Sequence, residues 1–152
     1  MYFYNLISNL AENEVIDLFI DMDGVISSYN FGMPLDFKNK RPLKTNINTL
    51  EKVSKIENVN LHILSVCRKD NEVQIKNEWL DINAPFFKKE NRNVLSKETY
   101  TGFSSAELKL DFLKKYNTSN KIVLVDDDNH VLSTISKELD NITLLQDSEL
   151  ID

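Results

Sequence analysis

The chain has 152 residues and a net charge of −6, with 41% hydrophobic and 28% charged residues, which is typical of one ordinary globular domain. The negative charge disfavours non-specific binding to nucleic acid, and no apolar run reaches the ~20 residues that a membrane-spanning helix needs. The single cysteine, Cys67, excludes a disulfide framework and a cysteine metal cluster. The N-terminal segment lacks a basic region and a cleavage site, so we expect a cytoplasmic location and no membrane partner.

Helices are predicted where apolar residues recur every three or four positions, and strands where short apolar runs occur. In chain order we expect a helix at 2–13, a strand at 15–20, an extended loop at 28–42, a helix from 45, a strand at 59–66, a helix at 71–80, a strand at 84–88, a helix from 104 to about 116, a strand at 121–125, a helix at 130–139 and a strand at 142–145. This alternation predicts an α/β fold, namely a doubly wound, mainly parallel Rossmann-like sheet with helices on both faces. Residues 15–152 would form one domain, and residues 1–14 a helical extension.

Capping residues mark the start of three predicted helices. Thr45 or Asn46 is a plausible cap for the helix from 45. The spacing of Ser104 and Glu107 predicts a capping box. One residue of the acidic run that precedes the helix at 130, either Asp128 or Asn129, should cap it.

Polar side chains follow three of the predicted strands at the point where each strand ends. Asp21 and Asp23 follow the first strand, Ser65 ends the second, and an acidic run of Asp126, Asp127 and Asp128 follows "IVLV". In a doubly wound sheet, ligands bind beyond the carboxyl ends of the strands, where the strand order reverses. We therefore expect these groups to meet at one site, with Lys109 reaching in from the helix that leads into the fourth strand.

This set of groups supports a particular chemistry. Clustered carboxylates favour a hard cation, and Mg²⁺ prefers carboxylate and carbonyl oxygens. A cation, a lysine and a hydroxyl around a vacant space form a phosphate site. One carboxylate can then attack phosphorus to form an aspartyl-phosphate. A second, two residues on, can protonate the leaving oxygen and later activate water. An acidic turn that merely caps a helix is the simpler alternative for Asp21 and Asp23.

The segments "FIDMDGVI", "LHILS" and "IVLVDDDN", together with a lysine between the last two, resemble the four motifs of the haloacid dehalogenase (HAD) superfamily of phosphohydrolases. The resemblance covers residues 15 to 146 and implies a Mg²⁺-dependent phosphomonoesterase. Asp21 would be the nucleophile and a Mg²⁺ ligand. Asp23 would be the general acid/base and would bind Mg²⁺ through its carbonyl. Ser65 would hold the phosphoryl group.

Two assignments within the motifs leave a choice of residue. In the acidic pair of the fourth motif, we favour Asp127 as the metal ligand and Asp126 as its close supporter. Lys109 is the preferred lysine of the third motif because it lies on the helix before the fourth. Three other lysines are rivals for that role: Lys88, Lys89 and Lys97.

A narrower similarity, to the small 5'-nucleotidase and deoxyribonucleotidase group, implies a small phosphorylated substrate, specifically a nucleotide. That group has a helical cap after the first motif, whereas here only Val25 to Lys40 are available, so the domain should be capless or nearly so. Tyr29, Phe31 and Phe37 lie in this segment and could either stack on a base or pack the loop down. An uncovered site also admits a large substrate, such as a nucleic-acid end or a phosphoprotein, or a second subunit that covers it. A non-catalytic phosphate-binding scaffold is a further alternative.

Overall fold

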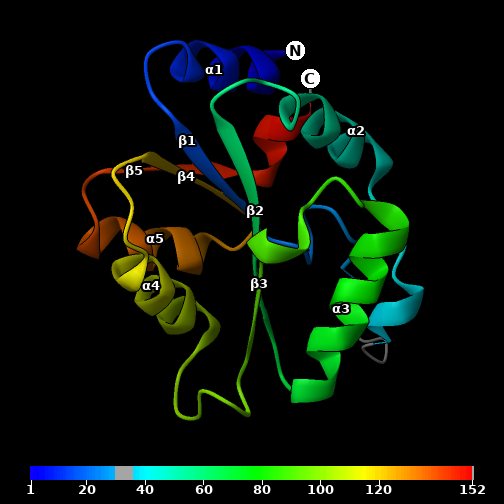
Figure 1. Cartoon of the computed structure of the whole chain (residues 1–152). Helices are drawn as coiled ribbons and strands as arrows, with labels where there is room; N and C mark the ends of the chain where they lie inside the picture. Colours follow the sequence, from blue (N-terminus) through cyan, green and yellow to red (C-terminus); the bar gives the residue numbers. More distant parts are fainter. Residues whose placement is uncertain (30–35, 152) are drawn as a thin grey trace.

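The sheet defines the architecture of the protein. The computed structural model describes residues 1–29 and 36–151, and its five strands form one all-parallel sheet in the order β3-β2-β1-β4-β5 (Figure 1). The strands are β1 (Ile16–Ile20), β2 (Val59–Cys67), β3 (Arg92–Ser96), β4 (Lys121–Asp126) and β5 (Ile142–Gln146). The strand order reverses between β1 and β4, as in a doubly wound Rossmann-like sheet. The predicted α/β fold class is therefore confirmed.

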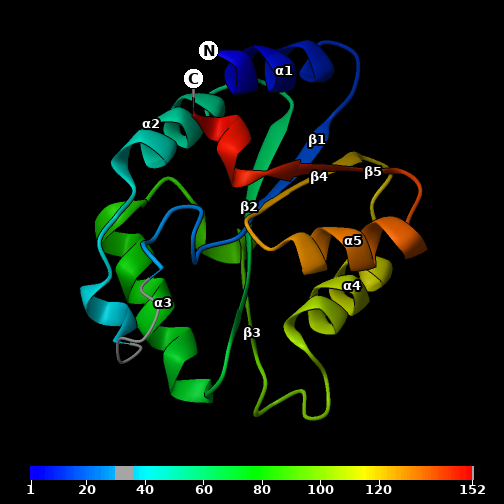
Figure 2. The same ribbon diagram turned by 180° about the vertical axis from the view of Figure 1, so that it is seen from behind.

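Helices cover both faces of the sheet. They are α1 (Tyr2–Ala11), α2 (Lys44–Val53), α3 (Asp70–Asn83), α4 (Ser105–Lys115) and α5 (Asn129–Glu138), with short 3-10 turns η1 (Phe37–Asn39), η2 (Lys89–Asn91) and η3 (Asp147–Leu150). Figures 1 and 2 show α1, α2 and α3 on one side, and α4 and α5 on the other. Within residues 1–29 and 36–151, no helix has the length and apolar character that a membrane span requires.

Strand β1 separates two apolar clusters because its side chains alternate between the two faces. Leu18 and Ile20 belong to the cluster beneath α1, α2 and α3, whereas Phe19 belongs to the one beneath α4 and α5. All five residues of β1 are buried, as expected of a central parallel strand. The carboxyl end of β1 is thereby held at the centre of the sheet, where it positions the residues that follow.

Helix α1 buries Phe3, Ile7 and Ala11 in the same apolar cluster that contains one face of β1. Helix α1 and the turn η3, which lie near the two ends of the described chain, are in contact and lie beside α2 (Figure 1). The division of the chain into an extension and a domain at residue 14 stays a prediction.

The prediction of a strand at 84–88 is wrong. Residues 84–88 form a turn after α3, in which the amide of Ala84 donates to Leu80 O and that of Phe87 to Ala84 O. Their apolar character reflects burial of the Phe87 side chain in the core rather than strand pairing. The strand that pairs with β2 at this edge of the sheet is β3, whose half-buried sequence lacks the apolar run that marks a central strand.

Two of the three predicted helix caps are confirmed, and the third is wrong. The Ser104–Glu107 capping box is present, and Asp128 caps α5 by accepting a hydrogen bond from the His130 amide. Neither residue expected to cap α2 does so, because the helix begins earlier, with Leu43 at its N-cap. The side chain of Asn46 instead donates to Val25 O at 2.7 Å, which ties α2 to the loop after β1.

Candidate active site

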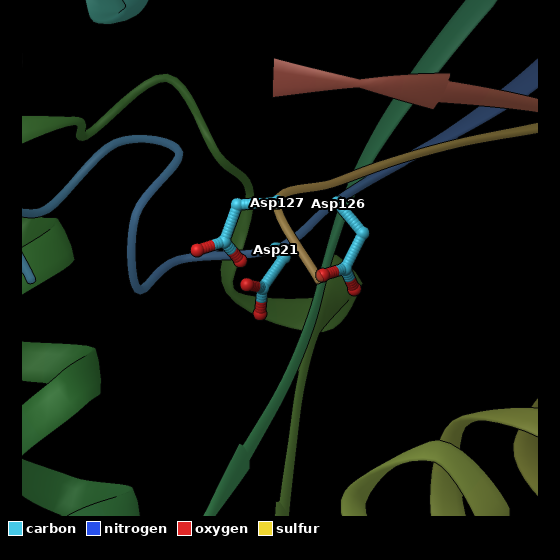
Figure 3. A group of neighbouring side chains, drawn as sticks. All are labelled: Asp21, Asp126 and Asp127. Carbon is cyan, nitrogen blue, oxygen red and sulfur yellow. The ribbon is translucent and has the colours of Figure 1, made fainter. Parts of the chain in front are cut away.

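Three carboxylates gather where the strand order reverses. Asp21 directly follows β1, Asp126 is the last residue of β4, and Asp127 comes next (Figure 3). The amide of Asp21 donates to Val125 O at 3.0 Å, which places the end of β1 against β4. One carboxylate oxygen from each of the three residues lies within 4.8 Å of the others. Asp21, Asp126 and Asp127 therefore lie close together, as the sequence predicts.

The loop after β1 is shaped to admit Asp127. Gly24 has φ +80°, and a Cβ atom there would lie 2.0 Å from Oδ2 of Asp127. A side chain at position 24 would therefore displace a carboxylate of the cluster, and the backbone conformation itself favours glycine. Met22 O accepts hydrogen bonds from three successive amides, those of Val25, Ile26 and Ser27, which closes the turn.

Lys109 lies between two of the carboxylates. Its Nζ donates to Oδ1 of Asp21 at 2.9 Å and to Oδ2 of Asp126 at 2.6 Å, and the residue is buried. Helix α4 brings the lysine there from its own face of the sheet. Lys88 and Lys89, two of its rivals, lie in the turn before β3, at the opposite end of the strands.

The electrostatics of this cluster favour a bound cation. Burial raises the pKa of Asp21 to about 8, because it disfavours the charged form; Lys109 opposes this shift and the Asp126 carboxylate adds to it. Burial and Asp126 also raise the pKa of Asp127 to about 6. Burial lowers the pKa of Lys109, but Asp21 and Asp126 outweigh it and leave that pKa above its usual value. An all-oxygen donor set with excess negative charge suits a hard divalent cation such as Mg²⁺.

Asp23 is held by two lysines that the sequence did not single out. Lys76 Nζ donates to Oδ2 of Asp23 at 3.0 Å, and Lys40 contacts Oδ1 of the same carboxylate. Burial alone would raise the pKa of Asp23, but the two ammonium groups outweigh it, so that this pKa lies below its usual value. Asp23 thus contacts two lysines, whereas Asp21 contacts one lysine and lies beside two other carboxylates.

Ser65 lies beneath this arrangement and is fully buried. Its Oγ accepts a hydrogen bond from Lys76 Nζ at 2.8 Å, and the same ammonium donates to Val66 O at 3.0 Å. A hydroxyl that accepts from a lysine keeps its own proton free to donate. A role for Ser65 in holding a phosphoryl group stays a prediction, as do the catalytic roles of the aspartates and of Lys109.

Two adjoining pockets open above these residues. The first, called here the acidic pocket, has a volume of about 510 Å³ and is lined by Asp21, Asp23, Tyr29, Val66, Ser105, Lys109, Asp126, Asp127, Asp128 and Val131. The second, called here the basic pocket, has a volume of about 230 Å³ and is lined by Asp23, Tyr29, Phe37, Lys40, Val66, Cys67, Arg68, Glu72, Lys76, Lys97 and Ser105. Asp23 lines both pockets.

The described aromatic residues of the loop between β1 and α2 differ in burial and in the contacts that they make. Tyr29 is 51% exposed and lines both pockets. Phe37 is buried and packs edge-on against Trp79, with ring centroids 5.9 Å apart, so this ring holds the loop against α3. Trp79 itself is a core residue, and its Nε1 donates to Lys40 O. The expectation for Phe31 lies outside the described residues.

Comparisons with known proteins give a match in structure and none in sequence. No protein-family model matches the chain, and no curated protein matches it. Among solved structures, the chain resembles a chain of the Pnkp1/Rnl/Hen1 RNA repair complex, with a TM-score of 0.68 and 18% identity over 88% of this chain and 42% of that one. The chain thus spans less than half the length of its structural neighbour, and at this identity the likeness extends to the fold alone. The protein is an α/β domain that resembles part of an RNA repair complex and carries a cluster of carboxylates that could bind a metal ion.

Proposed function

We propose that the protein is a Mg²⁺-dependent phosphomonoesterase that works through an aspartyl-phosphate and removes the terminal phosphate from a nucleic-acid end. The observation that carries this proposal is the setting of Asp21. Its carboxylate lines the acidic pocket, contacts Lys109 and lies beside Asp126 and Asp127, so that a nucleophile, a cation site and a phosphate-binding ammonium converge.

In the first half of the reaction, Asp21 attacks and Asp23 acts as the acid. A bond forms between an Asp21 oxygen and phosphorus while the bond from phosphorus to the leaving oxygen breaks, and Asp23 gives that oxygen a proton. Mg²⁺ held by Asp21, Asp127 and the Asp23 carbonyl, with Asp126 in support, would neutralise the phosphoryl oxygens. Lys109 stabilises charge that develops on the same oxygens.

In the second half, Asp23 accepts a proton from water as the water oxygen attacks phosphorus. The bond between phosphorus and Asp21 breaks, inorganic phosphate leaves, and both aspartates return to their starting states. Lys76 and Lys40 hold the Asp23 carboxylate in one orientation and favour its ionised form, which is the form that accepts the proton from water. The two aspartates therefore divide the work between attack and proton transfer.

A nucleic-acid end is the better-supported substrate. The structural neighbour belongs to an RNA repair complex. Of the described residues between β1 and α2, only η1 is helical, so these residues form no helical cap of the kind that would favour a small substrate. A mononucleotide, which the sequence resemblance implies, remains the second candidate because the exposed Tyr29 ring lines the pocket and offers a base a surface on which to stack.

The test is phosphate release from oligonucleotides phosphorylated at either end, from mononucleotides and from p-nitrophenyl phosphate, with Mg²⁺ or with EDTA. We expect hydrolysis that requires Mg²⁺ and that is faster with oligonucleotide ends. Faster hydrolysis of mononucleotides would instead identify the protein as a nucleotidase. Absence of turnover on every substrate, combined with binding of inorganic phosphate, would instead identify a phosphate-binding scaffold.

A further inference from the structure

We infer that the basic pocket is a second phosphate subsite, which binds the phosphodiester next to the terminal phosphate that Asp21 attacks. Arg68 and Lys97 would be the residues that recognise it. This inference rests on the proposed function and narrows the substrate to phosphomonoesters that carry a second phosphate within reach. Four features support it: the charge of this pocket, the availability of two of its cations, their position on adjacent strand ends and the junction with the acidic pocket.

The basic pocket has an excess of positive charge. Its lining contains four cationic side chains and two carboxylates: Lys40, Lys76, Arg68 and Lys97, against Asp23 and Glu72. The first two lysines both contact Asp23, so their charge is partly compensated. Glu72 is partly engaged as well, because one of its oxygens accepts a hydrogen bond from the Arg68 amide at 3.0 Å. The remaining positive charge belongs to Arg68 and Lys97.

The side chains of Arg68 and Lys97 are available for a ligand. Among the described residues, neither side chain makes an ion pair or a hydrogen bond. Arg68 is exposed and Lys97 is half-buried. Both would be able to turn toward an anion without first giving up a protein partner.

The sheet places these two residues side by side. Arg68 follows Cys67 at the end of β2, Lys97 follows Ser96 at the end of β3, and Cys67 and Ser96 are register partners. The Lys97 amide also donates to Cys67 O at 3.0 Å, which extends the pairing beyond the strands. A guanidinium and an ammonium on adjacent strand ends form a site that suits a phosphate, since arginine can bind two of its oxygens at once.

The junction of the pockets determines the class of ligand. Asp23, Tyr29, Val66 and Ser105 line both of them. One molecule can therefore place its terminal phosphate beside Asp21 and a second phosphate beside Arg68. A nucleoside with a single phosphate has no group for the basic pocket, whereas the end of a nucleic acid always carries the next phosphodiester.

The experiment compares two substrates that differ by one phosphodiester: a nucleoside monophosphate, and a dinucleotide that carries its terminal phosphate on the same nucleoside. We expect kcat/KM to be about tenfold higher for the dinucleotide, the scale of one charge-assisted hydrogen bond. Arg68→Gln and Lys97→Gln should each lower this ratio severalfold, and the double variant should bring it close to one. Lys69→Gln is the matched control, because it removes a neighbouring surface charge that does not line the pocket, and it should preserve the ratio.

Two further results distinguish a phosphate subsite from base stacking and from failure of the proposed function. A dinucleotide advantage that survives in the double variant would indicate base stacking and would overturn the inference, as would a ratio near one in the wild type. If no substrate is hydrolysed, the proposed function fails, but the subsite is still tested by the affinity of Asp21→Asn protein for the two compounds. Tighter binding of the dinucleotide that depends on Arg68 and Lys97 would support the subsite even then, and equal binding would exclude it.

Discussion

The acidic and basic pockets are neighbours with opposite charge. The acidic pocket is lined by five carboxylates and one lysine, and the basic pocket by four cations and two carboxylates. The difference follows from the strands that end in each. The acidic residues follow β1 and β4, whereas Arg68 and Lys97 follow β2 and β3. In the proposed function, this segregation of charge by strand presents a cation site and an anion site to the same ligand.

Asp23 lines both the acidic and the basic pocket, and its electrostatic environment differs from that of Asp21. Its side chain is held by Lys76 and Lys40, yet it lies two residues from Asp21. Opposite shifts in pKa follow, with that of Asp21 raised and that of Asp23 lowered. The chain thus keeps two carboxylates of the same sequence motif in different electrostatic environments. A cation bound beside Asp21 would favour the ionised form of its carboxylate, which attack on phosphorus needs.

The largest effect is expected from removal of the proposed nucleophile. Asp21→Asn should leave less than a tenth of wild-type kcat, a loss above ~1.4 kcal/mol. Asp17→Asn is the matched control, because Asp17 is also buried on β1 but lies at the other end of the sheet, where it accepts hydrogen bonds from Asn60, Thr118 and Asn120. The Asp17→Asn variant should be less stable than the wild type but should keep its kcat when folded. Similar losses of kcat in both variants would mean that the acidic pocket has no special role.

Addition of Mg²⁺ should stabilise the protein through the acidic pocket. At a concentration ten times Kd, binding to the native state contributes roughly 1.4 kcal/mol, or roughly 3–6 °C in melting temperature. Asp127→Asn should reduce the shift, because it removes one of the three carboxylates that lie together. Thermal melts at matched ionic strength measure it. An equal shift with a monovalent salt would argue against a specific cation site.

Without metal, the acidic pocket should destabilise the protein as pH rises. The pKa of Asp21 is 3.8 in the unfolded chain and about 8 in the folded one, so the folded state holds more protons between these values. Stability in EDTA should therefore fall as pH increases from 4 to 8. Asp21→Asn removes this contribution, and its melting temperature should exceed that of the wild type by an amount that grows with pH. If the melting temperatures of the two proteins changed with pH in the same way, the raised pKa of Asp21 would be contradicted.

The smallest expected effect is in the salt dependence of the two substrate classes. At a fixed, saturating Mg²⁺ concentration, kcat/KM for the dinucleotide should fall more steeply with NaCl than that for the nucleoside monophosphate. The difference in logarithmic slope should be about 0.7, the value for one phosphate of a single strand. Equal slopes would mean that the basic pocket makes no contact with the additional phosphate.

Much of the acidic pocket could be predicted from the sequence. Residues that follow buried apolar strands must lie at the carboxyl edge of a parallel sheet, so the position of Asp21, Asp126 and Asp127 follows from the strands alone. Lys109 could be placed because the helix that carries it leads directly into β4. In each case the position depends on an element with a clear apolar pattern.

The lysines around Asp23 could not be predicted in this way. Lys76 lies on α3 between Ile75 and Asn77, and nothing in its local sequence distinguishes it from a solvated lysine. It is buried only because α3 packs beside the end of β2, which is a tertiary contact. Strand β3 could not be predicted for a related reason, since an edge strand with the sequence "RNVLS" lacks the apolar run that identifies a central strand. The position of Lys97, and with it the basic pocket, depends on that strand.

The most direct test of this account is chemical trapping of the proposed covalent intermediate. A radiolabelled terminal phosphate would be mixed with the enzyme and Mg²⁺, the reaction quenched in acid within a turnover, and the labelled peptide identified by mass spectrometry. The account predicts an acid-stable, hydroxylamine-sensitive acyl-phosphate on Asp21 that is absent from Asp21→Asn protein. Rapid phosphate release with no label on the protein at any quench time, or with label at another residue, would contradict it.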